Sequence, residues 1–382
     1  MELALYDVDS GYYARAARRS GRAGDFFTSV DVGPLFGDLL ERQLAEMADI
    51  LRTIDGALSA RTSNIIDIVE AGAGNGRLAA DILRAAQARH HEFYDRIALH
   101  LIEASPQARA AHRSTLGPLS ERLVSSSSEL PASFEGVLIA NELLDAMPVH
   151  QLVMREDGLR EVYVDIDRAA AFAPGGPLSQ ERIHLRTVEG PLSAPDLTAY
   201  LERLDVQLEP GWRVEVNLRA CEWIRGAARR LRRGFIIIID YGHAAQELYS
   251  ACHARGTLTT FARHMMAGAE AAGGVPRWLA SPGDEDITSH VDFTSVRVAA
   301  EREGLETIAF LDQTYFLLGI LGAGDAQPGG MKLDELETID DRVALRTLIM
   351  PGSLGSTHKV LILGKGVGAP ALSGCSYRIR VT

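Results

Sequence analysis

Residues 65–78 of the chain read IIDIVEAGAGNGRL and predict a strand, a glycine turn and a helix in succession. The apolar run Ile65–Val69 is the expected strand, residues 72–76 form the turn, and helical spacing begins at Leu78. Glycines permit positive φ and let a ligand approach the backbone closely, and the start of a helix exposes unpaired N–H groups. The stretch therefore predicts a ligand site between strand and helix, although a tight turn that needs glycine only for packing is the simpler alternative.

The spacing of the glycines and the acid before them indicate which ligand is bound. A dinucleotide site prefers G-x-G-x-x-G, with the pyrophosphate at the helix start. The turn here reads G-x-G-x-G, and a glutamate stands two residues before its first glycine. A carboxylate at that point repels a diphosphate and suits a cation. S-adenosylmethionine carries an ammonium and a sulfonium group and no phosphate, so it is the predicted cofactor. The predicted cofactor-binding residues of this segment are Glu70, Gly72, Gly74 and Gly76.

Three further apolar runs have the same character as the first. They are Ile97–Ile102, Val137–Ala140 and Phe235–Ile239, and each is nearly continuous rather than alternating. Such runs are typical of parallel strands that are covered on both faces. Because helical patterns lie between them, the sequence predicts a doubly wound, Rossmann-like α/β fold.

Polar residues stand where these predicted strands end. Glu103 and Ser105 follow the second run, residues 141–145 (NELLD) follow the third, and Asp240 follows the fourth. Ligands of open α/β sheets bind outside the carboxyl ends of the strands. We therefore expect Glu103 to accept the two hydroxyls of a ribose. Three residues of the third strand end are expected where methyl donor and acceptor meet: Asn141, Glu142 and Asp145. The alternative for each acid taken alone is a solvated loop residue.

The remaining sequence divides into segments of different character. Residues 149–200 contain alternating apolar residues around Asp157-Gly158, which predicts a β-hairpin. Thr307–Leu311 and Lys359–Leu363 are candidates for two further strands. The predicted organisation is an N-terminal lid and helix (1–60), the cofactor-binding half of the core (61–150), a β-rich insertion (151–210), a continuation of the core (211–242), an inserted substrate lobe (243–300) and C-terminal strands of the core (301–382).

Composition narrows the classes of partner. The chain has 382 residues, 46% of them hydrophobic and 24% charged, which is ordinary for a globular protein. Its formal charge of −12 repels polyphosphate, so we expect no nucleic-acid partner and favour a basic protein substrate. Three cysteines without paired spacing suit a reducing compartment. No apolar run approaches the roughly 20 residues that span a bilayer, so we expect no membrane insertion. The expected location is the bacterial cytoplasm, or the mitochondrial matrix in a eukaryote.

Several catalytic and metal motifs are missing from the sequence. The eleven histidines form no H-x-x-x-H or H-x-H pair and have no cysteine partner at ligand spacing, so no metal is predicted. Neither G-x-x-x-x-G-K-[ST] nor G-x-S-x-G occurs, which argues against a P-loop NTPase and a serine hydrolase. Two rival functions stay open: a nicotinamide-dependent Rossmann oxidoreductase, and a non-catalytic assembly chaperone that retains the methyltransferase fold.

Motifs along nearly the whole chain resemble those of one family. The N-terminal part contains Gly11-Tyr12-Tyr13, Gly24-Asp25-Phe26-Phe27-Thr28-Ser29 and Phe36-Gly37; after the glycine turn come residues 141–148 (NELLDAMP), Asp240-Tyr241-Gly242, Gly256-Thr257-Leu258, His264, Asp286-Ile287-Thr288, Val291-Asp292-Phe293 and residues 351–355. In this order the motifs resemble the MidA-like protein arginine methyltransferases, whose mitochondrial member assists respiratory complex I assembly. Three departures from the family pattern are Ala73 in place of Pro, Leu143-Leu144 in place of an aromatic-containing pair, and Val30-Asp31 in place of Pro-Glu.

The resemblance implies a seven-stranded methyltransferase sheet, S-adenosylmethionine as cofactor and a protein arginine as acceptor, such as an arginine of a complex I subunit. Carboxylates would pair with the guanidinium group, and Glu142 and Asp145 are the predicted catalytic pair. Asn141 is expected to hold either the acceptor or the methionine part of the cofactor. Asp25 is expected to close over the cofactor as part of a lid. Whether the chain forms a homodimer stays open.

The acceptor channel is expected to be lined by Asp240, His264, Asp286 and Asp292. Structural alternatives exist for two of these sites. A histidine such as His264 is more often a hydrogen-bonded structural residue than a proton shuttle. The stretch Asp286-Ile287-Thr288 is also suited to cap a helix, because Asp and Thr accept hydrogen bonds from free N–H groups there.

Overall fold

The structure is a computed structural model, and it describes residues 1–14, 28–58, 65–167, 185–262, 265–267, 276–322, 338–350 and 354–377. Its centre is a mostly parallel sheet in the order β14-β15-β9-β4-β1-β2-β3, with the short strand β13 paired to β9. The strands are β1 (Ile66–Ala71), β2 (Ile97–Ile102), β3 (Leu123–Ser127), β4 (Phe134–Asn141), β9 (Leu231–His243), β13 (Val291–Asp292), β14 (Glu306–Asp312) and β15 (His358–Lys365). All six runs predicted as core strands lie in this sheet, which confirms the predicted α/β class and its seven-stranded path.

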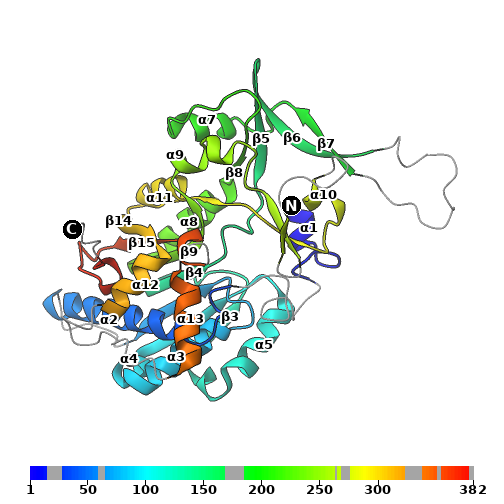
Figure 1. Ribbon diagram of the computed structural model, residues 1–382. Helices are drawn as coiled ribbons and strands as arrows, with labels where there is room; N and C mark the ends of the chain where they lie inside the picture. The colour runs from blue at the N-terminus through cyan, green and yellow to red at the C-terminus, as the bar shows by residue number, and fades with distance from the viewer. Residues whose placement is uncertain are drawn as a thin grey trace, which may run out of the picture.

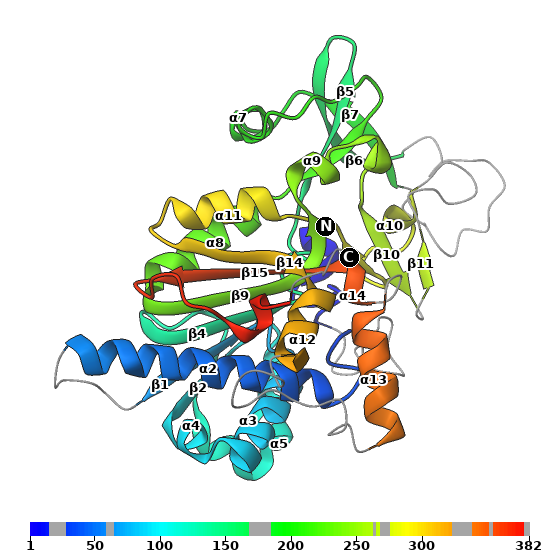
Figure 2. The same ribbon diagram turned by 60° about the vertical axis from the view of Figure 1, so that its left-hand side comes forward.

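Strands β1, β2, β3, β4 and β9 run parallel to one another, whereas β15 is antiparallel to both β9 and β14. The carboxyl ends of the parallel strands therefore meet at one edge. Helices cover both faces of the sheet (Figures 1 and 2). One face carries α2 (Leu35–Leu58), α3 (Arg77–Arg89) and α12 (Gln313–Gly322), and the other carries α8 (Leu218–Arg230) and α11 (Phe293–Glu301).

The central strand β9 shows why its sequence is apolar at every position. Ile237 and Ile239 belong to the core that packs against α2 and α3, whereas Ile236 and Ile238 belong to the core that contains α8 and α11. Side chains alternate between the two faces of a strand, so a strand covered on both sides needs apolar residues throughout. This burial explains the continuous runs in the sequence.

Shorter helices complete the core. They are α4 (His91–Arg96), α5 (Pro106–Leu116), η1 (Gly117–Arg122), α13 (Ile339–Ile349), α14 (Leu354–Thr357) and η5 (Ser373–Cys375). No helix of the described ranges is both long and apolar enough to cross a membrane.

The β-rich insertion forms a separate four-stranded sheet in the order β7-β6-β5-β8. It consists of β5 (His150–Arg155), β6 (Gly158–Ile166), β7 (Leu185–Gly190) and β8 (Arg213–Val216), and α7 (Asp196–Arg203) lies between β7 and β8 in the chain. The predicted hairpin around Asp157-Gly158 is confirmed by the antiparallel pairing of β5 with β6. In Figure 1 this sheet rises above the main one.

A second small sheet, β11-β10-β12, lies close to the N-terminal helix α1 (Glu2–Tyr6). Its strands are β10 (Thr259–Ala262), β11 (Met265–Ala267) and β12 (Asp286–Thr288). In the chain, α9 (Ala245–Leu248) and η2 (Ala251–His253) precede β10, and α10 (Arg277–Ala280) lies between β11 and β12. Leu5, Tyr12, Leu258 and Ile287 form a small apolar core between these segments. The segment predicted as a substrate lobe, 243–300, also includes most of α11, which packs against α8 on the main sheet.

Candidate active site

The turn between β1 and α3 has the backbone conformation that its glycines predict. Gly72, Gly74 and Gly76 have φ of 74°, 52° and 85°, in the left-handed region that favours glycine. The N–H group of Gly72 donates to the carbonyl of Ile102 at 2.9 Å, which ties the turn to β2. A Cβ atom at Gly74 would meet open space, whereas one at Gly72 would meet the side chain of Leu143 at 3.1 Å. The turn therefore leaves room above Gly74 for a ligand to lie against the backbone.

Glu103 lies beside this turn. Its Oε2 accepts a hydrogen bond from the N–H group of Gly74 at 2.9 Å, and its Oε1 accepts one from the N–H group of Ser105 at 2.8 Å. An ionised carboxylate has about four lone-pair sites, so two remain for hydroxyl groups. Ser105 is the N-cap of α5, where its Oγ accepts a hydrogen bond from the N–H group of Ala108. Its predicted contact with the cofactor stays a prediction.

Glu70 is buried below the turn, and its Oε2 has no hydrogen-bond partner among the described residues. Burial raises the pKa of its carboxyl to about 8; a hydrogen bond from the backbone of Ala79 opposes the rise, and the charges of Glu103 and Asp81 add to it. Glu70 and Glu103 thus lie near enough to influence each other. A cationic group bound beside them would favour the ionised form of Glu70.

His112 makes a further contact with the turn, which no motif in the sequence indicates. Its Nε2 lies 2.9 Å from the carbonyl oxygen of Gly74, and its Nδ1 lies 2.9 Å from Oγ of Ser126 on β3. A carbonyl oxygen only accepts, so Nε2 carries the hydrogen and the serine hydroxyl donates to Nδ1. The fully buried ring therefore holds Gly74 from the side of α5. A lone histidine on a predicted helix has no sequence mark of such a role.

An N-terminal segment, residues 28–31, lies next to the same turn. Arg77, the first residue of α3, donates from Nη1 to Oδ1 of Asp31 at 3.0 Å and from Nη2 to the carbonyl of Val30 at 2.8 Å. Oδ2 of Asp31 accepts hydrogen bonds from the backbone N–H and the hydroxyl of Thr28. These contacts hold the segment beside the start of α3. The predicted lid residue Asp25 lies outside the described residues.

Asp240 at the end of β9 holds the backbone of the loop after β4. Its Oδ2 accepts hydrogen bonds from the N–H groups of Leu143 and Leu144 at 3.1 and 2.7 Å, and its Oδ1 accepts one from the N–H group of Tyr241 at 2.8 Å. The side chain has no exposed surface. Burial raises the pKa of Asp240 to about 7, against these hydrogen bonds. Its role is thus to position residues 141–145, and a contact with substrate, as predicted, finds no support in its burial.

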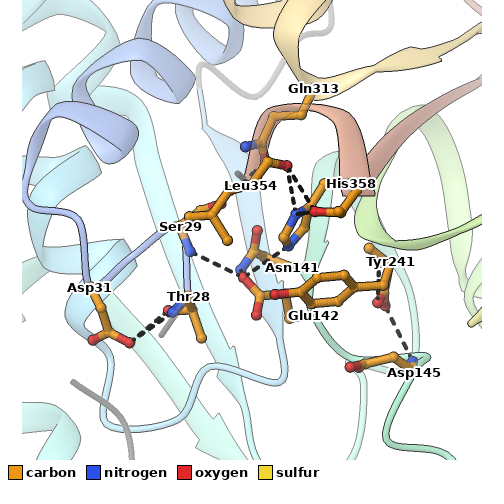
Figure 3. A network of polar contacts seen from close by, with 12 residues as sticks. Thr28, Ser29, Asp31, Asn141, Glu142, Asp145, Tyr241, Gln313, Leu354 and His358 are labelled. Atoms are coloured by element: carbon orange, nitrogen blue, oxygen red, sulfur yellow. Dashed lines mark hydrogen bonds and ion pairs between the residues drawn. The ribbon is translucent and has the colours of Figure 1, made fainter. Parts of the chain in front are cut away.

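Glu142 lies at the centre of a polar network that Figure 3 shows from close by. Its φ of 51° is in the left-handed region, which is uncommon for a residue other than glycine and typical of functional sites. Its Oε1 accepts a hydrogen bond from the N–H group of Ser29 at 3.2 Å and lies 3.5 Å from Nε2 of His358. The hydroxyl of Ser29 also contacts Gln313 of α12 at 3.2 Å. Segments from four parts of the chain therefore take part in this network.

His358 is the first residue of β15 and is fully buried. Its Nδ1 lies 2.9 Å from the carbonyl of Leu354, so Nδ1 carries a hydrogen and Nε2 faces Glu142. The ring of Tyr241 packs against the imidazole with centroids 3.9 Å apart. The only sequence signal was the position of His358 directly before Lys359–Leu363, one of the two further candidate strands.

Asn141 offers an acceptor at the same place. Its Nδ2 donates to Oε1 of Glu142 at 3.4 Å, whereas its buried Oδ1 has no hydrogen-bond partner within the described ranges. A buried carbonyl oxygen without a donor is costly, so it indicates a missing partner. An ammonium or guanidinium group would supply that donor.

Asp145 lies beyond Glu142 in an acidic and aromatic environment. Burial raises the pKa of its carboxyl well above the ordinary range, and the charges of Asp240, Glu142 and Asp286 add to the rise. Asp286 accepts a hydrogen bond from the hydroxyl of Tyr13 at 3.0 Å. The structure thus brings Glu142, Asp145 and Asp286 to one region, and their predicted role on the acceptor side stays a prediction.

Two N-terminal tyrosines border this region and were not among the predicted site residues. Tyr6 donates to the carbonyl of Ala146 at 3.0 Å, and its ring lies 5.3 Å from that of Tyr13. Burial raises the pKa of Tyr6, and the charges of Asp286, Asp145 and Glu103 add to the rise. Tyr6 therefore lies close to acids of both the cofactor side and the acceptor side.

One other predicted substrate contact differs from expectation. Asp292 is buried and is the N-cap of α11: its carboxylate accepts hydrogen bonds from Ser295 and from the hydroxyl of Tyr200. The capping role that the sequence suggested for the stretch beginning at Asp286 thus belongs to Asp292, because Asp286 lies in strand β12. His264 lies outside the described residues.

A family model supplies the first comparison with known proteins. A model of the Methyltransf_28 family, whose members are described as S-adenosyl-L-methionine-dependent methyltransferases, matches residues 39–311, well over half of the chain.

Curated relatives are named as arginine methyltransferases. The chain is 29% identical over 325 residues to protein arginine methyltransferase NDUFAF7, mitochondrial, of Rattus norvegicus, which covers 79% of the chain and 65% of the relative. It is 24% identical over 401 residues to the homologue of Drosophila melanogaster, which covers 97% of the chain and 82% of the relative. The chain spans about two thirds of the length of the vertebrate relatives.

Solved structures agree with the fold. A Burkholderia thailandensis crystal structure bound to S-adenosyl-homocysteine has a TM-score of 0.79 and 28% identity, and the match covers 100% of this chain and 90% of that one. A second structure from the same organism, without that ligand in its description, has a TM-score of 0.77 and 27% identity.

The geometry fits the same cofactor: the space above Gly74, the carboxylate of Glu103 and the unpartnered Oδ1 of Asn141 suit a ribose and an ammonium group. The chain therefore belongs to the Methyltransf_28 family of S-adenosyl-L-methionine-dependent methyltransferases.

Proposed function

We propose that this chain transfers a methyl group from S-adenosylmethionine to a guanidinium nitrogen of an arginine that a protein substrate presents. The observation that carries the proposal is the acidic acceptor region. Within the described ranges, no lysine or arginine forms an ion pair with Glu142, Asp145 or Asp240. Burying carboxylates together without a cation is unfavourable, as the raised pKa of Asp145 indicates. A guanidinium group from a substrate would relieve this cost, and the curated relatives are named for methylating arginine.

Arginine suits this region better than lysine does. Guanidinium is planar and presents five N–H donors in a fixed fork, which two neighbouring carboxylates can accept. Pairing with Glu142 and Asp145 would hold one nitrogen in line with the sulfonium methyl group. It would also keep positive charge on the other two nitrogens, so that the attacking nitrogen is a better nucleophile. Tyr6 and Tyr13 would border the aliphatic part of the substrate side chain.

The reaction releases one proton, and the network around Glu142 offers an acceptor. The S–CH₃ bond breaks, an N–CH₃ bond forms, the sulfonium becomes a neutral thioether, and one N–H proton leaves the guanidinium group. Glu142 is the proposed first acceptor, and Nε2 of His358, 3.5 Å from its Oε1, is the proposed second. His358 is suited to this because its Nδ1–H already donates to Leu354.

The sharpest test combines the two predicted catalytic carboxylates with a matched control. Labelled S-adenosylmethionine is incubated with the protein and arginine-containing peptides, and with the same peptides carrying lysine in place of arginine. We expect label in the arginine peptides alone, and methylarginine after hydrolysis. Glu142→Gln and Asp145→Asn should transfer methyl at least about 100-fold more slowly. Glu156→Gln, a change of an exposed hairpin carboxylate, should match wild type. Equal rates in all variants, or label in lysine, would overturn the proposal.

The finer parts of the proposal rest on the family resemblance. We infer a respiratory complex I subunit as the substrate, and the bacterial cytoplasm or the mitochondrial matrix as the location. Purified complex I subunits with labelled cofactor test the substrate directly. Binding of S-adenosyl-homocysteine without methyl transfer to any of them would favour the non-catalytic chaperone instead.

A further inference from the structure

Three histidines that are distant in the sequence lie together at the carboxyl edge of the main sheet. His243 ends β9, His253 ends η2, and His290 immediately precedes β13. Ring nitrogens of the three lie within 4.8 Å of one another. The ring centroids are 4.8 to 5.9 Å apart, so each imidazole faces both of the others. In the part of the chain that the structure describes, this is the one group of three side chains with such an arrangement.

The surroundings prepare one of these rings, that of His253, to bind a cation through Nε2. Nδ1 of His253 lies 3.0 Å from the backbone carbonyl of Glu247. Nδ1 of His243 lies 3.0 Å from Oε1 of the same residue, without the geometry of a hydrogen bond. A carbonyl oxygen only accepts, so Nδ1 of His253 carries its hydrogen and leaves the lone pair on Nε2. Metal-bound histidines almost always donate their second N–H to a carbonyl or a carboxylate in this manner.

The third ring supplies an independent observation. His290 is largely buried, and its Nδ1 has no hydrogen-bond partner among the described residues. Its own backbone N–H donates to Oγ1 of Thr257 at 3.0 Å, which holds the residue in place. A buried imidazole nitrogen without a partner calls for a ligand, a water or an ion.

We propose that His243, His253 and His290 bind one zinc ion or a similar divalent transition metal. Imidazole suits zinc, and three protein ligands with an open fourth position form a known class of zinc site. Zn–N bonds of about 2.0–2.1 Å require the rings to approach one another slightly, which side-chain rotation allows. The sequence predicts no metal because these three histidines come from separate segments and lack the close spacing of a ligand motif.

Such an ion would connect segments that border the acceptor region. His253 lies on the stretch that leads to Thr257, whose N–H and hydroxyl donate to Glu215. His290 follows β12, the strand that carries Asp286. The ion would therefore fix the wall of the acceptor side relative to the end of β9. This inference does not depend on which residue the enzyme methylates.

The test uses untagged full-length protein that has been treated with chelator and dialysed. Equilibrium dialysis with Zn²⁺ and elemental analysis should give one ion per chain, and Co²⁺ should give the visible absorption of a tetrahedral nitrogen site. His253→Gln and His290→Gln should each weaken Zn²⁺ binding at least about 100-fold, and Glu247→Gln about 10-fold. His150→Gln, a change of a half-buried histidine that pairs with Glu161, is the matched control and should bind as wild type.

His290→Gln is the variant most at risk of misfolding, because its ring is buried. Binding of S-adenosyl-homocysteine checks that each variant still folds, and the more exposed His253 gives a second, independent variant. Absence of stoichiometric Zn²⁺ from the wild type, or unchanged Zn²⁺ affinity in His253→Gln, would overturn the proposal.

Discussion

The cofactor side and the acceptor side of the site are built in different ways. On the cofactor side, the glycine turn directly follows β1, β2 is the next strand along the chain, and Glu103 reaches the turn across one strand pair. On the acceptor side, Glu142 contacts Ser29, which in turn contacts Gln313, and His358 faces it from β15. The first is a local structure that short sequence motifs encode. The second exists only when distant segments have packed, so we expect it to be less tolerant of substitution.

The largest expected effect is on the acceptor side. Asp240→Ala removes the acceptor for the N–H groups of Leu143, Leu144 and Tyr241. Each buried N–H group that is left unpaired costs about 1–3 kcal/mol, so we expect the free energy of unfolding to fall by about 3–5 kcal/mol. Urea denaturation measures it. Asp240→Asn keeps one oxygen acceptor and should lose less; equal stability of Asp240→Ala and wild type would refute the positioning role.

The second largest effect is expected on the rate of catalysis, which should depend on the acceptor side more than on the cofactor side. In Glu142→Gln we expect kcat to fall about 100-fold, equivalent to about 2.7 kcal/mol, because a neutral amide neither pairs with the guanidinium charge nor takes its proton. The Kd for S-adenosyl-homocysteine should change less than about threefold. Steady-state kinetics and calorimetry test the pair of values. A parallel rise in Kd would place Glu142 on the cofactor side.

Glu103→Gln should show the opposite pattern. The amide keeps one oxygen but loses charge and one acceptor, so we expect affinity for S-adenosyl-homocysteine to fall about 10- to 30-fold, or about 1.4–2 kcal/mol. With saturating cofactor, kcat should stay within about threefold of wild type. Calorimetry against the Glu156→Gln control decides this, and unchanged affinity would exclude Glu103 from the cofactor site.

The pH dependence of stability offers a smaller contrast. The pKa of Glu70 is raised from 4.5 to about 8 and that of Asp240 from 3.8 to about 7. At neutral pH each of these carboxyl groups keeps a proton in the folded state that it has lost in the unfolded chain. The resulting contribution to the free energy of unfolding is fully present below the pKa of the unfolded state, and it is lost as the pH rises through the pKa of the folded state. We expect stability to fall by about 2 kcal/mol between pH 6.5 and pH 8.

Glu70→Gln should reduce that fall at its upper end, because the amide does not titrate. Thermal unfolding at several pH values measures the difference between variant and wild type. The same pH slope in both would show that Glu70 titrates normally.

The smallest effect concerns the segment that joins the two sides. Arg77→Ala removes the contacts to Asp31 and Val30, but the guanidinium group is partly exposed. Such an ion pair contributes less than about 1 kcal/mol. We expect affinity for S-adenosyl-homocysteine to fall about two- to threefold. Arg84→Ala, which breaks the more exposed pair with Asp81, is the control and should leave that affinity unchanged.

The sequence predicted the strands, the glycine turn and the acids at the strand ends, and it could not predict which acids are structural. Asp240 lies near the carboxyl end of β9 and Asp292 ends β13, and both accept backbone hydrogen bonds inside the protein. The backbone N–H group of Leu144 donates to Asp240, and that of Ser295 donates to Asp292. Nothing in the order of residues along the chain shows which backbone N–H group will face a carboxylate. Tyr6, His112 and His358 were missed for the same reason, since each acts through a contact with a remote segment.

By itself, the sequence determined the α/β class, most strands of the main sheet and the cofactor turn. These depend on local rules: continuous apolar runs for strands covered on both faces, and glycines where φ is positive. Only the tertiary structure decided which carboxylates meet at the acceptor side, which histidine holds the turn and which three histidines come together. Those groupings depend on how helices and loops pack across the carboxyl edge of the sheet. Packing joins residues by distance in space, which spacing along the chain does not record.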